Sequence, residues 1–250
     1  MTSALLLGAT KGLGLELARE GARRQISPII YGRSVGNPNA ITEAPHGATL
    51  HRLDLQSRDS VMQVPLPDQP VAYVLWIAGA FHKAPLEHTD PDDIDLHTDL
   101  HFRGPVHFLH RFLRHRLEPF HLVTIGSVSS WRLREDEALY CGLKAAQTAF
   151  TRNLAVELAR DRPGARVTVV NPGGLNVPTF WEKMPQDLSG FLDPAMVARF
   201  VWDSVAEQRG PYREIQIMRP KPAVVGSPPL IEYGPRCPEV LDGAAPRGSV

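Results

Sequence analysis

Residues 4–14 read Ala4-Leu5-Leu6-Leu7-Gly8-Ala9-Thr10-Lys11-Gly12-Leu13-Gly14, an apolar run followed by glycines in the spacing GxxxGxG. The run predicts a buried strand, and Leu13, Leu17 and Ala18 begin the apolar stripe of a helix. Glycine is needed where a backbone turns tightly against a pyrophosphate, whose charge the helix N-terminus stabilises. A glycine-rich turn alone is as often a plain connection. Between a first strand and a first helix, it predicts a dinucleotide site.

A second motif lies at Tyr140-Cys141-Gly142-Leu143-Lys144, with Ser127 upstream at the end of the apolar run 120–125. In a helix, Tyr140 and Lys144 lie on one face. A phenol has a pKa of roughly 10, so acid–base work near neutral pH requires a shift of about three units. A nearby ammonium favours the phenolate, and Ser127 offers a hydroxyl to the same reacting oxygen. The three groups therefore predict a carbonyl site.

Together these motifs resemble the short-chain dehydrogenase/reductase family in its single-domain form. The resemblance runs from about Ser3 to Met218 and includes Asp54, Ile77-Ala78-Gly79 and Asn171-Pro172-Gly173. It implies an α/β, three-layer Rossmann fold over residues 1–218, doubly wound, with a mostly seven-stranded parallel sheet and helices on both faces. Residues 219–250 are rich in proline, which predicts an irregular or partly disordered tail.

The resemblance implies catalytic roles for Ser127, Tyr140 and Lys144. It also implies that Asp54 lies beside the adenine of a nicotinamide cofactor. The implied cofactor-binding residues are Gly8, Thr10, Lys11, Gly12, Leu13, Gly14, Arg33, Asp54, Leu55, Ala78, Gly79, Tyr140, Lys144, Pro172 and Gly173.

The residues after the second predicted strand, Ser27–Tyr31, favour NADP(H) over NAD(H). NAD sites usually place an acid here to bind the ribose 2′-hydroxyl, whereas an arginine neutralises a 2′-phosphate. This chain has Gly32 and then Arg33, and Lys11 adds a second cation. The alternative is that both cations are solvated surface charges.

Two positions depart from the family pattern. The usual Asn-Asn-Ala-Gly is Trp76-Ile77-Ala78-Gly79 in this chain, and His101 stands where many relatives carry a catalytic Asn. In relatives that Asn holds a water in a proton relay. Histidine also holds water and titrates near neutrality, so His101 can conserve the relay. The alternative is a substitution that slows or removes turnover.

Several histidines lie in or near the long helix predicted for residues 91–117. His97 and His101 are four residues apart, and His107, His110 and His115 follow. No glutamate is placed as in HExxH, and no cysteine supplies a further ligand. We expect no metal, and we interpret most of these histidines as a polar helix face.

Composition sets the remaining expectations. The 250 residues have a formal net charge of zero, which favours neither nucleic acid nor an anionic membrane as partner. No run reaches the roughly 20 apolar residues of a membrane helix. Cys141 and Cys237 give no disulfide framework, so we expect a cytoplasmic protein. In the family, the helix that begins near Tyr140 often pairs with its symmetry mate, which implies a homodimer or homotetramer.

The leading hypothesis is an NADP(H)-dependent oxidoreductase that reduces a ketone or aldehyde or oxidises the alcohol, with Tyr140 as general acid and base. One alternative is a cofactor-binding regulatory or scaffold protein with weak or lost catalysis. Another is a cofactor-binding isomerase or dehydratase in a biosynthetic pathway. The substrate is a small molecule whose identity the resemblance does not give. An apolar set either forms a lid over a bulky substrate or packs a short helix: Phe180, Trp181, Met184, Leu188 and Phe191.

Overall fold

The apolar run near the start of the chain forms the strand β1 (Ser3–Leu7), and Leu5, Leu6 and Leu7 are fully buried. In this computed structural model, which describes residues 2–37, 44–182, 184–220 and 228–239, β1 lies inside the sheet. Leu5 and Leu7 join the core on one face, while Leu6 joins the core on the other. Successive side chains of a strand point to opposite faces, so β1 requires cover on both sides.

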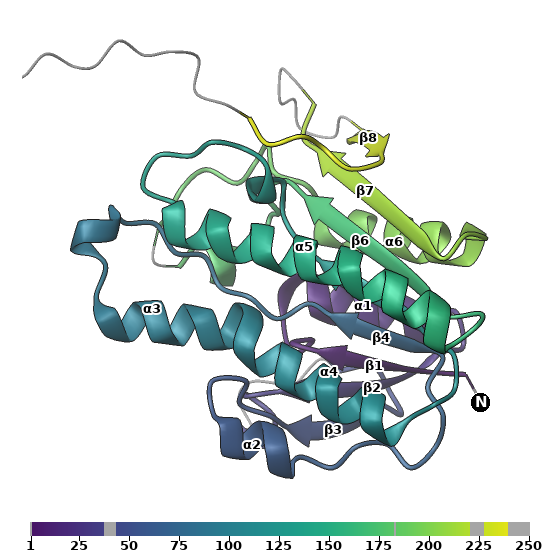
Figure 1. Ribbon diagram of the computed structural model, residues 1–250. Helices are drawn as coiled ribbons and strands as arrows, with labels where there is room; N and C mark the ends of the chain where they lie inside the picture. The colour runs from purple at the N-terminus through teal and green to yellow at the C-terminus, as the bar shows by residue number, and fades with distance from the viewer. Residues whose placement is uncertain (1, 38–43, 183, 221–227, 240–250) are drawn as a thin grey trace, which may run out of the picture.

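The sheet has eight strands in the order β3-β2-β1-β4-β5-β6-β7-β8 (Figure 1). Strands β1 to β7 are parallel, and β8 is antiparallel to β7. The predicted Rossmann fold, with its seven parallel strands, is confirmed. The remaining strands are β2 (Ser27–Gly32), β3 (Thr49–Arg52), β4 (Tyr73–Trp76), β5 (His121–Ile125), β6 (Arg166–Pro172), β7 (Tyr212–Met218) and β8 (Leu230–Tyr233).

Strand β8 corrects one expectation, because it lies in the segment 219–250 that the sequence predicts to be irregular. Leu230 pairs with Met218 and Tyr233 with Ile215. Pairing satisfies backbone groups that would otherwise be open along the edge of β7, and this gain does not depend on a strong local strand pattern. Residues 221–227 and 240–250 lie outside the described residues, and the domain boundary at 218 stays a prediction.

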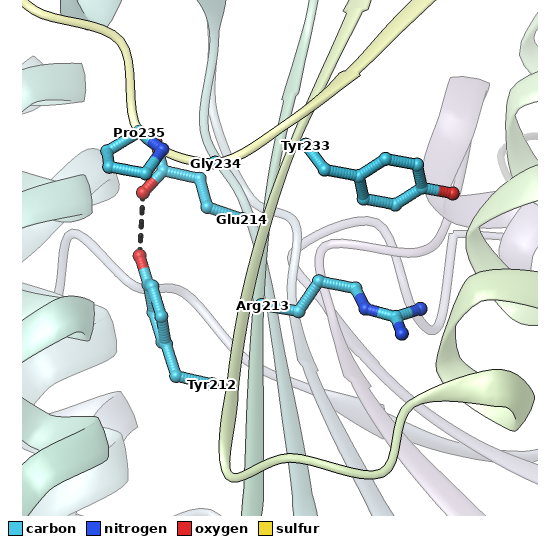
Figure 2. A pocket seen from close by; sticks show the side chains of 6 residues that line it. All are labelled: Tyr212, Arg213, Glu214, Tyr233, Gly234 and Pro235. Carbon is cyan, nitrogen blue, oxygen red and sulfur yellow. Dashed lines mark hydrogen bonds between the residues drawn. The ribbon is translucent and has the colours of Figure 1, made fainter.

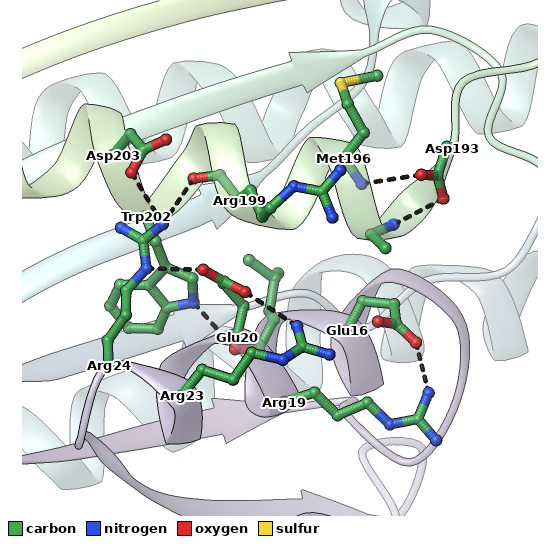
Figure 3. A network of polar contacts seen from close by, with 12 residues as sticks. Glu16, Arg19, Glu20, Arg23, Arg24, Asp193, Met196, Arg199, Trp202 and Asp203 are labelled. Carbon is green, nitrogen blue, oxygen red and sulfur yellow. Dashed lines mark hydrogen bonds and ion pairs between the residues drawn. The ribbon is translucent and has the colours of Figure 1, made fainter. Parts of the chain in front are cut away.

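Helices cover both faces of the sheet (Figure 1). On one face, α1 (Gly12–Arg23) and α6 (Pro194–Glu207) share a core. Their contacts include an indole N–H of Trp202 that donates to the Leu17 carbonyl at 2.9 Å, and Arg24, which pairs with both Glu20 and Asp203 (Figure 3). The other face carries α4 (Gly104–His115) and α5 (Ala138–Asp161), with α2 (Arg58–Gln63) beside α4.

The long helix predicted over residues 91–117 is confirmed from Pro91 to His115, and it contains one wide turn. It consists of α3 (Pro91–Thr98), a π-helical turn η2 (Asp99–Arg103) and α4. Two local causes are visible. Pro105 has no N–H to donate to the preceding turn, and Gly104 packs so closely on the Leu55 carbonyl that a side chain would collide with it. Such wide turns are frequent at functional sites, and this one carries His101.

The loops after β1, β4, β5 and β6 emerge at the carboxyl ends of neighbouring parallel strands. Ligands of doubly wound folds bind outside these ends. Short 3-10 turns lie in the segments that follow three of these strands. They are η1 (Leu86–His88) after β4, η3 (Val128–Ser130) after β5 and η4 (Pro178–Phe180) after β6.

Candidate active site

Ser127, Tyr140 and Lys144 lie together in a buried site. Ser127 follows β5, and its hydroxyl accepts a hydrogen bond of 3.1 Å from the Ser129 N–H. Tyr140 lies in the first turn of α5 and is hydrogen-bonded to the Ser127 side chain, and Lys144 is one helical turn further on. Their exposed fractions are 8%, 6% and 4%. The convergence that the motif spacing predicts is therefore present in the structure.

The Tyr140 phenol is protonated in this environment. Burial raises its pKa well above the usual value, and the hydrogen bond with Ser127 opposes that rise. The negative charge of Glu137 raises the pKa further. The structure thus holds a proton on Tyr140 that is available to a group placed beside it.

Lys144 is held away from solvent by neutral acceptors. Its Nζ donates to the Ile125 carbonyl at 3.1 Å and to Gln147 Oε1 at 3.0 Å. Burial lowers its pKa to about 7. The sequence argument makes the Lys144 ammonium the group that lowers the Tyr140 pKa, but in the structure the hydrogen bond with Ser127 has that effect.

His101 is fully buried beside this site. Its ring lies 5.6 Å from the Tyr140 ring, and its Nε2 is 2.8 Å from the Ala80 carbonyl oxygen and 3.1 Å from the Ala80 nitrogen. Burial and the nearby Lys144 lower the pKa of His101 far below its usual value, so the ring is neutral at neutral pH. Among the described residues its Nδ1 has no hydrogen-bond partner. This nitrogen can take part in a relay only through a molecule that enters the site.

Gly79 lies close to both His101 and Lys144. A Cβ added to Gly79 would lie 3.0 Å from His101 Cε1 and 3.5 Å from Lys144 Nζ. The predicted cofactor residue Gly79 therefore borders the catalytic groups, and a side chain there would push against both.

A buried polar network fixes the backbone of Ser127. The Asn171 side chain accepts from the Ser127 N–H at 3.1 Å and donates to Glu214 Oε1 at 3.1 Å. Glu214 is paired in turn with Arg152 through two bonds of 2.8 and 2.9 Å. These residues come from β6, β7 and α5, so three elements together determine where β5 delivers Ser127.

The glycine turn fits a dinucleotide phosphate. Gly8 has φ of +86° and Gly12 has φ of +55°, and a Cβ on Gly8 would lie 2.6 Å from the Ala78 Cα. Lys11 precedes α1 without capping it through its side chain. The first N–H groups of α1 therefore remain open to an anion. The Thr10 side chain packs directly against Gly32, at the end of β2.

The other predicted cofactor residues lie along the same edge of the sheet. Arg33 is exposed after β2 and donates to Gln56 Oε1 at 3.3 Å. Asp54 caps a turn by accepting from the Gln56 N–H at 3.0 Å, and Leu55 packs on Gly104. Leu13 lies in the first turn of α1 and Ala78 follows β4, whereas Pro172 ends β6 and Gly173 comes next.

Comparison with known proteins decides the family. The model of the short chain dehydrogenase family matches residues 2–188. The chain belongs to this family. The family resemblance that the motifs predict is therefore confirmed, and with it the oxidoreductase class and the use of NAD(H) or NADP(H) as the family's cofactors.

Three relatives of this short-chain dehydrogenase illustrate the range of similarity. An uncharacterized oxidoreductase of Staphylococcus epidermidis is 26% identical over 182 residues, which cover 70% of this chain and 78% of that protein. An NADPH-dependent pterin aldehyde reductase of Arabidopsis thaliana is 28% identical over 187 residues, covering 69% and 74%. The crystal structure of a short-chain dehydrogenase/reductase from Vibrio parahaemolyticus aligns with a TM-score of 0.74 at 23% identity, covering 87% of this chain and 99% of that one, and shows the shared fold.

Aromatic rings cover the catalytic groups of this short-chain dehydrogenase. The Phe81 ring lies 5.1 Å from Tyr140 and 4.8 Å from Trp181. Trp181 in turn contacts Phe180 at 5.2 Å and Phe191 at 5.3 Å. We call Phe81, Phe180, Trp181 and Phe191 the aromatic cluster. The segment after β6 therefore contacts Phe81 beside Tyr140, and it also contains the short turn η4, so both the lid and the packing interpretation stay predictions.

Trp76 shows how the chain accommodates its departure from the family's Asn-Asn-Ala-Gly. Its side chain is fully buried and contacts the Phe150 ring at 6.1 Å. In the described part of the chain its indole N–H has no hydrogen-bond partner. Where the family pattern has an Asn side chain, this chain has the buried Trp76, which packs near Ala78 and Gly79.

Sequence reasoning missed several residues that shape the site. Asn171 was part of a recognised motif but had no assigned role, and Gln147 could have been found because it lies three residues after Lys144. Glu214 is a charge inside a buried strand, which is itself a signal of a partner. Phe81 carried no sequence signal.

The described residues contain neither a membrane-spanning helix nor a metal-binding group of side chains. No helix there is long and apolar enough to cross a membrane. No three side chains of His, Cys, Asp or Glu are grouped closely enough there to hold a metal ion.

Proposed function

We propose that this short-chain dehydrogenase is an NADP(H)-dependent oxidoreductase that reduces a ketone or aldehyde to an alcohol, or catalyses the reverse reaction. The observation that carries the proposal is that Ser127, Tyr140 and Lys144 are buried together beside the loops that follow β4 and β5. A small-molecule substrate, a cytoplasmic location and a homodimer or homotetramer are parts of the same proposal.

In the proposed reaction, the Ser127 hydroxyl donates a hydrogen bond to the substrate carbonyl oxygen. Tyr140 gives its proton to that oxygen as negative charge develops there. Lys144 binds the nicotinamide ribose. The nicotinamide, when bound, supplies or accepts the hydride. The Asn171–Glu214–Arg152 network keeps Ser127 in place during the reaction.

Tyr140→Phe tests the proton donor. The variant should lose turnover of a carbonyl panel by about a hundred- to ten-thousandfold, because general acid catalysis typically contributes 10²–10⁴-fold. Its affinity for NADPH, measured by fluorescence titration, should stay within about threefold of the wild type, since the ring remains. Unchanged turnover would show that Tyr140 is not the acid.

The preference for NADP(H) is supported by Arg33 and Lys11 and by the absence of an acid at Gly32. The Arabidopsis relative is also NADPH-dependent. A hydrogen bond to a charged group is worth about 1.5–3 kcal/mol, so Arg33→Ala should weaken NADPH binding by roughly ten- to a hundredfold and leave NADH binding unchanged. Calorimetric titration with both cofactors measures this, and an equal loss for both would refute the role of Arg33.

A second candidate function is a cofactor-binding protein with weak or lost catalysis, and His101 in place of the family's Asn favours it. Bound NADPH without turnover of any carbonyl in a broad panel would support this reading. An isomerase or dehydratase would instead form product without net oxidation of the cofactor.

A further inference from the structure

Arginines gather around Trp131, in the loop that follows Ser127. The guanidinium carbons of Arg132 and Arg236 lie 4.9 and 5.3 Å from the Trp131 ring centre. Arg219 follows β7 and lies 4.3 Å over the Phe191 ring. Arg134 is close enough to act on Arg132 and Arg219. We call Arg132, Arg134, Arg219 and Arg236 the basic cluster.

The basic cluster has more positive charge than the described carboxylates around it neutralise. Arg236 pairs with Glu232, but within the described ranges no carboxylate forms an ion pair with Arg132, Arg134 or Arg219. Burial and the charge of Arg134 lower the pKa of both Arg132 and Arg219. The four guanidinium groups have three carboxylates near them, Glu232 beside Arg236, Glu239 beside Arg132 and Glu137 beside Arg134, and the remaining positive charge favours an incoming anion.

Glu239 is a carboxylate bound by the loop of this cluster. Glu239 accepts a hydrogen bond of 2.9 Å from the Leu133 N–H, and its backbone N–H donates to the Trp131 carbonyl at 2.7 Å. It is the acid that raises the pKa of Arg132. The loop therefore has donors that fit a carboxylate, and Glu239 meets only one side of the cluster.

The basic cluster is joined to the catalytic groups by the aromatic cluster. Arg219 stacks on Phe191, Phe191 contacts Trp181, and Trp181 contacts Phe81, which lies against Tyr140. On the other side, Trp131 packs with Met218 and with Val128, the neighbour of Ser127. These contacts form a chain of rings that begins at Tyr140 and ends at Arg219.

We propose that the substrate is an aromatic ketone or aldehyde that carries a carboxylate, and that Arg132 and Arg219 bind this carboxylate while the aromatic cluster holds the ring. This inference rests on the proposed carbonyl reduction. It adds a substrate class and two specificity-determining residues. Arginine suits the role because its planar fork matches a carboxylate and its face stacks on aromatic rings.

The test measures the affinity of 6-acetyl-2-naphthoate and of its methyl ester for the NADP⁺-loaded protein by calorimetry. The two probes share ring and ketone and differ only in charge. The wild-type protein should bind the acid at least tenfold more tightly than the ester. Arg219→Gln and Arg132→Gln should each reduce that preference at least fivefold, and Glu239→Gln should increase it because a competing charge is removed.

Arg213→Gln is the matched control. Arg213 lies on the same strand, β7, and its guanidinium carbon also lies over an aromatic ring, Tyr233, at 5.7 Å. It lines a separate hollow of about 400 Å³ at the amino-terminal half of the strand (Figure 2). This variant should keep the wild-type preference for the acid.

An acid that binds no more tightly than its ester, or a preference that persists in both Arg132→Gln and Arg219→Gln, would overturn the proposal. Turnover of the ester with NADPH reports separately on the proposed reaction. Ester turnover without acid preference would leave the carbonyl reductase intact and remove the carboxylate site. Tighter binding of the acid without turnover of either probe would support the carboxylate site and contradict the proposed carbonyl reduction.

Discussion

Lys144 gives the clearest electrostatic consequence at the scale of single residues. Its pKa falls from 10.5 to about 7 on folding because the ammonium is buried. Between these two values the unfolded chain binds a proton that the folded protein lacks, so the contribution of Lys144 to stability rises with pH across this window and is smallest below about pH 7.

Lys144→Met should remove that pH dependence. Without cofactor, the free energy of unfolding of the wild type should rise relative to the variant by roughly 1.4 kcal/mol per pH unit between about pH 7 and 9. Urea denaturation at pH 7, 8 and 9 measures the difference. Parallel pH profiles for the two proteins would show that Lys144 keeps its proton when buried.

His101 permits a second prediction. An Asn at this position keeps both a donor and an acceptor for Ala80, whereas a leucine has neither and leaves buried polar groups unpaired at a cost of about 1–3 kcal/mol. His101→Asn should therefore retain turnover within about tenfold, and His101→Leu should lose more. The pH profile of kcat should flatten in the Asn variant if the imidazole takes part in proton transfer. Loss of all activity in His101→Asn would contradict the relay hypothesis.

The sequence could predict contacts that depend on spacing along one helix, such as Tyr140 with Lys144. The meeting of Ser127 with Tyr140 required the family order of strands as well. The contact of Asn171 with Ser127 could not be predicted in this way, because it joins β6 to β5 across the sheet and depends on register. The role of each predicted site residue stays a proposal.

At the scale of elements, the sequence predicts the long helix over residues 91–117 but not the wide turn η2 within it. Gly104-Pro105 is a helix-breaking pair, but the apolar periodicity continues through it and dominates the pattern. The sequence also does not show that the Leu55 backbone lies against Gly104, because this contact joins segments far apart in the chain.

Asn171 is the element-scale link that mutation can test. Asn171→Ala leaves the buried Ser127 N–H without its acceptor and removes one of the donors to Glu214, so stability should fall by about 1–3 kcal/mol and kcat should fall with little change in KM. The matched control is Gln208→Ala. Gln208 is also a buried amide and donates to the Val167 carbonyl at 3.1 Å, away from the carboxyl ends of the strands.

Gln208→Ala should lose comparable stability but keep kcat, provided that Asn171 positions Ser127. Denaturant unfolding and steady-state kinetics on the same preparations separate the two effects. Equal losses of kcat in both variants would show that Asn171 stabilises the fold but does not position Ser127.

At the scale of the whole molecule, the seven parallel strands could be predicted because each motif of the family marks the end of a particular strand. Strand β8 could not. Leu230–Tyr233 is short and lies among prolines, so nothing local distinguishes it, and only the open edge of β7 gives it a partner.

The last prediction concerns assembly through α5. Gly142, Ala149 and Val156 are exposed on this 24-residue helix and are spaced by seven residues, so they lie on one face. Val156 is 71% exposed, and a Cβ added to Gly142 would meet nothing within 4 Å. Such a face of small and apolar residues permits close approach of a second helix.

The wild type should therefore be a dimer or tetramer at micromolar concentration in light scattering, and Val156→Glu should shift it to a smaller species. Burying a carboxylate in a symmetric helix contact would place two like charges together, which is unfavourable by several kcal/mol. Leu86→Glu is the control, because Leu86 is an exposed apolar residue of η1, outside α5. A wild-type monomer, or an unchanged mass for Val156→Glu, would exclude the α5 face as the interface.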